Sequence, residues 1–157
     1  MKRILGVLLV LCMLFSMAGC EKTLGSASFL FLVITDDDSA DKEDIFEFVR
    51  ENEEALFKAI EAGNFSAFEN KGFLKDINMS KTVVDFSCGG AGVGSSTSYV
   101  GFYYTPANDM TAVWCAPPHP GSLLPSGKGF LWQEPDGDNR YYTEHICGNF
   151  YYYEASF

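Results

Sequence analysis

The amino-acid sequence predicts an α+β domain in which one N-terminal amphipathic helix packs on an antiparallel, aromatic-rich β-meander of about five to seven strands. Two observations support this prediction. Residues 41–62 repeat apolar side chains at the 3.6-residue period of a helix, whereas the chain after Phe65 changes to the two-residue period of strands. A helix followed by a run of strands is typical of the α+β class.

The predicted helix covers residues 41–62 and carries signals at both ends. Asp41, Glu43 and Asp44 crowd its first turn, where acidic groups favour the positive end of the helix dipole. Gly63 is a stop signal of the C-cap kind. We interpret the glutamates of this segment as its solvated face, with an acidic docking surface as the alternative. The apolar face consists of Ile45, Phe46, Phe48, Val49, Leu56, Phe57 and Ile60.

The rest of the chain reads as short strands rich in Val, Phe, Tyr and Trp and separated by turn residues. Residues 136–139 (Asp-Gly-Asp-Asn) and 148–149 (Gly-Asn) have the chemistry of hairpin turns. Consecutive hairpins predict an antiparallel meander. The candidate strands are residues 73–79, 82–88, 99–104, 111–115, 129–133, 140–146 and 150–155.

Aromatic residues are predicted on both faces of this sheet, because side chains alternate along a strand. One face can pack under the helix, and the other forms either a second core layer or a partly exposed aromatic surface. We predict Tyr103, Tyr151 and Tyr153 as candidate binding residues for a sugar or a protein, although cross-strand aromatic pairing alone also accounts for them. Along residues 99–104, Tyr99 and Tyr103 lie on one face and Phe102 and Tyr104 on the other. Along residues 150–153, Phe150 and Tyr152 likewise lie opposite Tyr151 and Tyr153.

Composition is consistent with a single globular domain. The 157 residues fit one domain with a short attached segment. With 15% aromatic residues, the chain is unlike a disordered polyelectrolyte. A formal net charge of −10 argues against nucleic-acid binding, which needs basic surface to displace counterions. We therefore expect one domain over residues 41–157 that binds no nucleic acid.

The first residues have the pattern of an export signal. Lys2 and Arg3 precede an uncharged apolar stretch, residues 4–15, which is too short for a comfortable membrane span. Residues 17–20 (Met-Ala-Gly-Cys) resemble the lipobox of bacterial lipoproteins, although Met stands where Leu is usual. In that family the Cys is diacylated and becomes the mature N-terminus. The resemblance thus implies a signal peptide over residues 1–19, and ordinary cleavage after residue 18 or a retained membrane helix are the alternatives.

Lipidation of Cys20 would place the protein on the extracytoplasmic face of the cell membrane. The acyl groups (diacylglycerol and palmitate) would hold it there, since an acidic surface is repelled by anionic lipid. Residues 20–40 are the predicted tether. Within it, residues 29–34 form an apolar run of six residues, too short to span a bilayer. This run is either a strand docked on the domain or a segment that contacts the membrane.

Four glycines stand close together in residues 88–97, which requires a special backbone. Gly89 and Gly94 have the spacing of a phosphate loop, but Ser95 occupies the position of its lysine. No helix pattern follows that could present its N-terminus to an anion. We therefore predict a wide turn or a bulge between two strands.

Cys88 is the one weak candidate for a catalytic nucleophile, with His119 or His145 as its base. The string of residues 85–89 (Asp-Phe-Ser-Cys-Gly) is faintly similar to cell-wall cysteine peptidases, in which a helix start lowers the thiol pKa. Here Cys88 ends a strand-like run, so a buried, inert thiol is the simpler interpretation, and a disulfide is a third.

The remaining cysteines and acids match no metal site. Cys88, Cys115 and Cys147 lack C-x-x-C spacing, and their odd number leaves at least one thiol free or paired between molecules. Asp136 and Asp138 lack the ligand ladder of a calcium loop. We predict no cofactor and no metal.

Several strings resemble small uncharacterised secreted or lipid-anchored proteins of Gram-positive anaerobes. These strings lie in residues 84–104, 138–140 and 150–154. The resemblance covers about two thirds of the chain and supports a surface location, but it implies no activity.

We therefore expect a cell-envelope lipoprotein whose domain is a binding or interaction module for a protein or glycan. The alternatives are an envelope hydrolase that uses Cys88 and an acidic, immunity-type inhibitor protein that masks a basic toxin.

Overall fold

A computed structural model describes residues 40–157 except residues 70, 94 and 95. The predicted signal peptide, Cys20, the tether and the apolar run at 29–34 lie outside the described residues. The described residues belong to one compact unit, Thr35–Phe157. No helix within the described residues is both long enough and apolar enough to cross a membrane.

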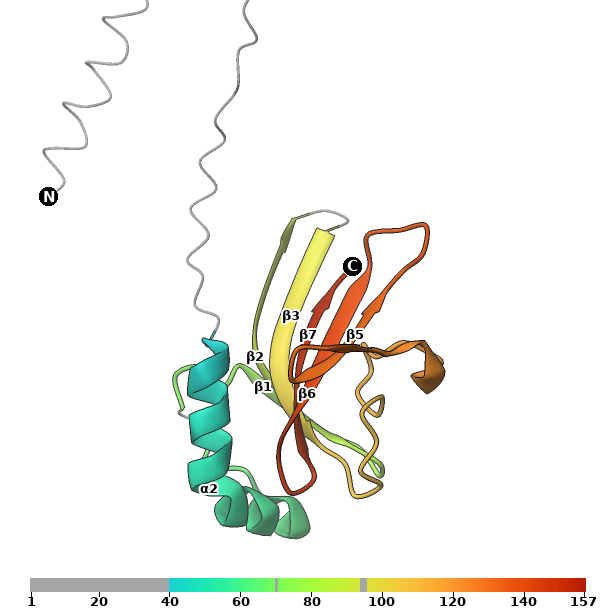
Figure 1. The fold of residues 1–157 in the computed structure, drawn as a ribbon. Coiled ribbons are helices and arrows are strands. Elements are labelled where there is room, and N and C mark those ends of the chain that lie inside the picture. The colour runs from blue at the N-terminus through green and yellow to red at the C-terminus, as the bar shows by residue number, and fades with distance from the viewer. Residues whose placement is uncertain (1–39, 70, 94–95) are drawn as a thin grey trace, which may run out of the picture. The chain divides into compact units, whose positions relative to one another are not determined.

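The described unit is an α+β fold, with a single α-helix and a seven-stranded antiparallel sheet among its described residues (Figure 1). The helix α2 spans Lys42–Ala62. A short 3-10 helix, η2, covers Pro120–Ser122. The strands are β1 (Asp76–Met79), β2 (Val84–Val93), β3 (Ser96–Tyr104), β4 (Leu124–Ser126), β5 (Gly129–Gln133), β6 (Arg140–Cys147) and β7 (Phe150–Ser156).

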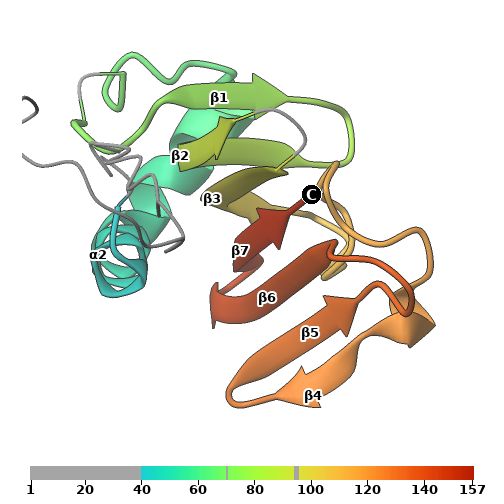
Figure 2. The ribbon, with the colours of Figure 1, turned by 90° about the horizontal axis from the view of Figure 1, so that it is seen from above.

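The sheet has the strand order β1-β2-β3-β7-β6-β5-β4, which Figure 2 shows from above. The prediction of one continuous meander is therefore wrong at one step. After β3 the chain crosses to the far edge through residues 105–123, and then returns strand by strand until β7 pairs with β3. A tight hairpin turn joins only neighbouring strands. The connection 105–123 is long enough to cross a face of the sheet and reach its far edge.

The helix forms over nearly all of the residues that the apolar period indicated. The Asp41 side chain accepts a hydrogen bond from the backbone N–H of Lys42 (3.1 Å) and caps the first turn. Gly63 ends the helix in the left-handed conformation (φ 60°), and its N–H donates back to the last turn. Both hairpin turns also agree with the sequence: β5 and β6 flank residues 134–139, and Gly148 turns β6 into β7 at φ 48°.

One predicted strand is wrong and one strand was missed. Residues 111–115 form turns, in which Val113 and Cys115 are buried while Trp114 points outward. Side chains in this segment alternate between buried and exposed, as they do in a strand. The segment nevertheless packs over the sheet and does not pair with it. The missed strand, β4, has three residues and contains Pro125, which is tolerated because β4 is an edge strand.

The sheet separates two apolar cores, one under α2 and one under the connection 105–123 (Figure 1). We call them the helix-side core and the loop-side core. The buried helix-side core combines the apolar stripe of α2 with sheet residues Val84, Phe86, Cys88, Phe102, Ile146, Phe150 and Tyr152, together with Phe68 and Leu74. The buried loop-side core consists of Tyr103, Val113, Cys115, Tyr141, Tyr151, Tyr153 and Ala155.

Candidate functional site

The three tyrosines predicted as a binding platform lie inside the loop-side core. Tyr103, Tyr151 and Tyr153 are all almost fully buried, and Val113 and Cys115 pack in the same core. Tyr151 and Tyr153 share one face of β7, as alternation along that strand predicted. Of the two alternatives for the second face, the structure shows a core layer at these residues, because the connection 105–123 covers them, so their rings offer no surface to a ligand.

Their hydroxyl groups explain why tyrosine suits this core. Tyr103 pairs with the Thr143 hydroxyl (3.3 Å), and Tyr151 donates to the Asn108 side chain (2.5 Å). A buried hydroxyl without a partner would cost free energy, so each hydrogen bond fixes a ring and the segment that it contacts. The bond from Tyr151, and one from the Tyr141 hydroxyl to the Met110 carbonyl (3.0 Å), therefore fasten the connection to the sheet, whereas the Tyr103 pair joins β3 to β6.

An exposed aromatic surface does exist on the loop side, beside this core. Trp114 keeps 61% of its surface exposed, although it is one of the largest side chains in the protein. Its ring meets Tyr99 of β3 edge to face, with centroids 5.1 Å apart, and lies 6.4 Å from the ring of Phe157. Phe157 is held by two backbone hydrogen bonds to Thr97. We call Tyr99, Trp114 and Phe157 the aromatic surface.

A buried carboxylate fixes the orientation of the exposed indole. Asp85 of β2 is only 4% exposed, and its two oxygens accept hydrogen bonds from Trp114 Nε1 (3.1 Å) and the Tyr153 hydroxyl (3.0 Å). Burial raises the pKa of Asp85, and the two donors oppose that shift. No cation forms an ion pair with Asp85 within the described residues. A buried acid costs stability unless it is well bonded, so this arrangement holds an exposed ring in one position at an energetic cost.

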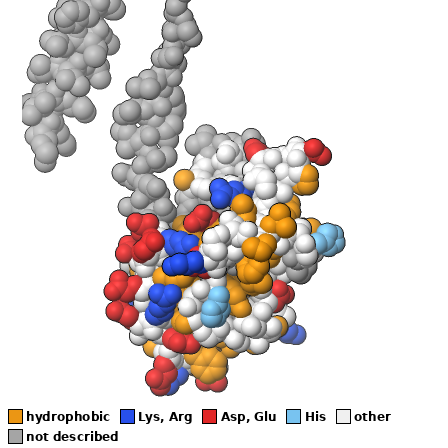
Figure 3. Space-filling view, in the orientation of Figure 1, with side chains coloured by type: hydrophobic (Ala, Val, Ile, Leu, Met, Phe, Trp, Pro, Cys, Tyr) orange, Lys and Arg blue, Asp and Glu red, His pale blue; other side chains and the backbone are white. Residues whose placement is uncertain are grey.

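Charge is segregated between the two sides of the molecule. Residues 41–62 hold eight acids and three bases, whereas Asp85 and Asp109 are the only charged residues in residues 82–127. That second range forms β2, β3, the connection and β4. Figure 3 shows acids and bases gathered chiefly over the helix, with a mostly uncharged surface beside it. Depletion of charge together with exposed aromatic rings is the compositional mark of an interaction surface.

On the helix side, polar groups dock the start of α2. Lys42 Nζ lies 2.5 Å from Glu144 Oε2 and 4.6 Å from the ring centroid of Tyr142, whose hydroxyl also donates to Glu144 (2.6 Å). Lys42 and Tyr142 both line two hollows of about 410 and 750 Å³. The first reaches Ala91 of β2, and the second runs between α2 and the β4–β5 turn.

Cys88 is a core residue in the structure. Its side chain is fully buried on the helix side, and its thiol donates to the Phe86 carbonyl (3.6 Å). Burial raises the pKa of this thiol far above its usual value, which disfavours the thiolate that a nucleophile needs. His145 contacts Tyr151 of the loop-side core, on the other face of the sheet, and His119 lies in the connection. Among the described residues, the hydrogen-bond partner of the Cys88 thiol is the Phe86 carbonyl, and that of the His145 ring is the Gly148 carbonyl.

The glycine-rich segment contains the predicted bulge, but its residues up to Val93 extend β2. A bulge interrupts the pairing with β3 between Ser87 and Gly89, and β2 then continues to Val93. Gly94 and Ser95 lie outside the described residues. The three cysteines 88, 115 and 147 are free, and burial raises the pKa of Cys147 to about 11. Among the described residues, no three His, Cys, Asp or Glu side chains gather closely enough to hold a metal ion.

The comparisons with known proteins identify no family for this chain. No protein-family model matches it, and neither a curated protein nor a solved structure gives a significant match. The resemblances carried by residues 17–20 and 84–104 therefore stay predictions from the sequence.

The residues that make the aromatic surface were missed by sequence reasoning. One signal was present: Asp85 is an acid within an apolar strand (Val-Val-Asp-Phe), which often means a buried carboxylate with a specific partner. Trp114 could not be recognised, because the segment around it was interpreted as a strand. Its exposure depends on how the connection folds over the sheet.

Proposed function

We propose that this protein is a cell-envelope lipoprotein, anchored by acyl groups on Cys20 at the extracytoplasmic face of the cell membrane. The support is the charged start, the short apolar stretch and the lipobox-like residues 17–20. The intact mass of the protein purified from native membranes tests the anchor. A chain that begins at Cys20 and carries a diacylglyceryl mass is expected, whereas an unmodified chain that begins at Gly19 would mean secretion.

We further propose that the domain is a binding module, and that its ligand contacts the aromatic surface. The observation that carries this proposal is the hydrogen bond from the exposed Trp114 indole to the buried Asp85 carboxylate. Holding a large apolar ring rigid in solvent brings no evident stability, but it lowers the ordering cost of binding. The uncharged surroundings favour a neutral ligand, and we infer an envelope glycan whose sugar rings stack on the indole.

Tryptophan fluorescence tests this site directly, because Trp132 is the only other tryptophan in the chain. In a Trp132→Phe background, titration with a neutral oligosaccharide of N-acetylglucosamine is expected to shift the Trp114 emission in a saturable way. Trp114→Ala should abolish binding as measured by calorimetry. Because it also removes one donor to the buried Asp85, circular dichroism checks that the variant is folded at the temperature of the titration. Binding that survives Trp114→Ala would place the ligand elsewhere, and a response only to a protein ligand would exclude the glycan.

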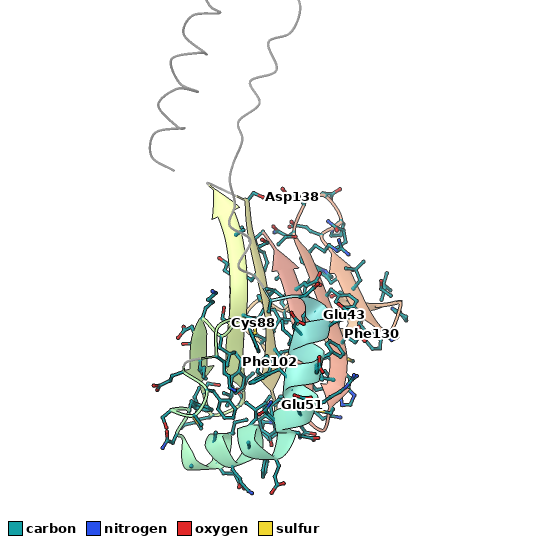
Figure 4. The ribbon with its side chains drawn as sticks, turned by 90° about the vertical axis from the view of Figure 1, so that its left-hand side faces the viewer. Glu43, Glu51, Cys88, Phe102, Phe130 and Asp138 are labelled. Atoms are coloured by element: carbon teal, nitrogen blue, oxygen red, sulfur yellow. The ribbon has the colours of Figure 1, made fainter. Side chains whose placement is uncertain are left out.

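The outer face of α2 favours one second candidate, an immunity-type inhibitor that binds a basic protein. Glu43, Glu47 and Glu51 follow one another at i, i+4 spacing, are exposed, and form no ion pair within the described residues. Figure 4 shows Glu43 and Glu51 along α2, with Cys88 and Phe102 on strands behind it. A basic protein encoded beside this gene should bind, and the triple change to Gln should weaken that binding and its salt dependence. Equal binding by the Gln variant would contradict this candidate.

A further inference from the structure

Among the described residues, the outer edge of β2 is paired along only half of its length. The edge strand β1 has four residues and pairs only with Val84–Ser87 of β2. Within the part of the chain that the structure describes, no strand pairs with the outer edge of β2 beyond Ser87. Gly90, Ala91 and Gly92 are exposed there, while their inner edge is paired with β3. The N–H and C=O of Ala91 both bond to the Ser98 hydroxyl (3.4 and 3.0 Å), so the flanking glycines supply the backbone groups for another strand.

This edge lacks the usual protection against pairing. Proteins commonly guard exposed edges with lysines, prolines or charges that point inward. Residues 88–93 contain none of these, and their glycines and alanine leave room for a neighbouring backbone. The Ser87–Gly89 bulge stands at the point where β1 ends, so it does not interrupt the open part. An unguarded edge of this kind is suited to β-strand addition.

The lack of charged side chains on the open part of β2 makes this edge suitable for pairing with a second copy of this chain. The chain has a formal net charge of −10, so two copies repel each other over most of their surfaces. The open edge lies within residues 82–127, the range in which Asp85 and Asp109 are the only charges, and Asp85 is buried. Asp41 and Lys42, which line the same hollow as Ala91, have opposite signs, so two copies that approach through this edge meet few opposing like charges. The edge is also identical in both copies, as an isologous two-fold interface requires.

We propose that the protein forms a homodimer in which the β2 edges of two copies pair in antiparallel fashion. A two-fold axis perpendicular to the sheet joins the two sheets into one continuous sheet. This symmetry keeps both α2 helices on one face and both loop sides on the other. The two Trp114 side chains then lie on the same face, so the dimer presents two aromatic surfaces; that consequence rests on the proposed binding function, whereas the dimer itself does not.

Ala91 is the position at which this pairing is best tested. It lies in the middle of the open edge, is exposed and already carries a Cβ atom. A Cβ atom on Gly90 or Gly92, in contrast, would meet backbone oxygens of β3 at 2.6 and 2.7 Å. We therefore use Ala91→Lys and Ala91→Glu, each of which places like charges near one another across the two-fold axis. Ala91→Ser is the matched, uncharged control.

The experiment co-expresses two full-length copies with different tags and measures how much of one copy is recovered with the other from detergent-solubilised membranes. Wild-type and Ala91→Ser pairs are expected to be recovered together. Lys with Lys, and Glu with Glu, should be recovered at least about tenfold less, which corresponds to about 1.4 kcal/mol. Lys with Glu should restore recovery, because the opposite charges attract, and this rescue also shows that both variants fold.

Three outcomes would overturn the proposal: no recovery of the wild-type pair, equal recovery of every pair, or a loss with Lys and Glu that the mixed pair does not restore. Trp114→Ala copies are expected to pair like the wild type while losing the glycan response. Co-recovery of the two tagged copies therefore tests the dimer, and the glycan response separately tests the proposed binding function.

Discussion

Compared with the helix-side core, the loop-side core is built from more polar groups and is covered by a less regular segment. On the helix side, Phe86 and Phe102 stack with ring centroids 4.5 Å apart beneath the apolar stripe of α2. On the loop side, Tyr151 donates a hydrogen bond to Asn108 of the segment that covers it, and Asp85 accepts one from Trp114 of the same segment. Apolar burial stabilises the first face, and satisfied polar groups determine the geometry of the second. The face that carries the exposed tryptophan is thus the one held by specific hydrogen bonds.

The largest expected effect is on the helix side. Phe102→Ala removes a fully buried ring that contacts Phe48, Phe86 and Phe150, and should lower the free energy of unfolding by about 3–5 kcal/mol. Urea unfolding followed by circular dichroism measures this. Phe57→Ala, the same change at a side chain that is 40% exposed, is the matched control and should cost far less. Equal losses would mean that the core under α2 is not closely packed.

A smaller effect is expected on the loop side. Asp85→Ala leaves the Tyr153 hydroxyl and the Trp114 indole without their acceptor, and should lower the free energy of unfolding by about 1–3 kcal/mol. Asp85→Asn keeps one oxygen acceptor without the charge and should cost less. The Trp114 near-ultraviolet dichroism should decrease in the Ala variant, because the ring loses its fixed position. An unchanged spectrum would show that Asp85 does not orient the indole.

The smallest expected effect is a pH dependence of opposite sign on the two faces. Burial raises the pKa of Asp85, so this group stabilises the fold below about pH 4, and the contribution is lost as pH rises through the folded-state pKa. Burial also acts on Glu144, but the hydrogen bond and charge of Lys42 outweigh it and lower that pKa. Glu144 therefore stabilises the fold at pH values above its pKa in the unfolded chain. That stabilisation is lost as the pH falls through its pKa in the folded protein.

Unfolding free energies measured from pH 3 to pH 7 check both signs. Relative to Asp85→Asn, the wild type should lose stability as pH rises across this range. Relative to Glu144→Gln, it should gain stability over the same range. If both differences in unfolding free energy changed with pH in the same direction, the opposite pKa shifts of Asp85 and Glu144 would be contradicted.

The sequence by itself determined the features that depend on neighbouring residues. The bounds of α2 follow from its apolar period, from Asp41 and from Gly63, and the turn at Gly148 follows from a residue that tolerates positive φ. The two aromatic faces follow from alternation along β3 and β7, which pair residue by residue. These features are local, because backbone geometry alone decides them.

Only the tertiary structure decided which aromatic residues are exposed. The connection 105–123 leads from β3 to β4 at the far edge of the sheet and covers Tyr103, Tyr151 and Tyr153. Trp114, in contrast, stays exposed to solvent with its indole bonded to Asp85. Asp85 and Trp114 are separated by 29 residues in sequence. No local period encodes such a contact, because it depends on how a long segment of irregular structure packs across the sheet.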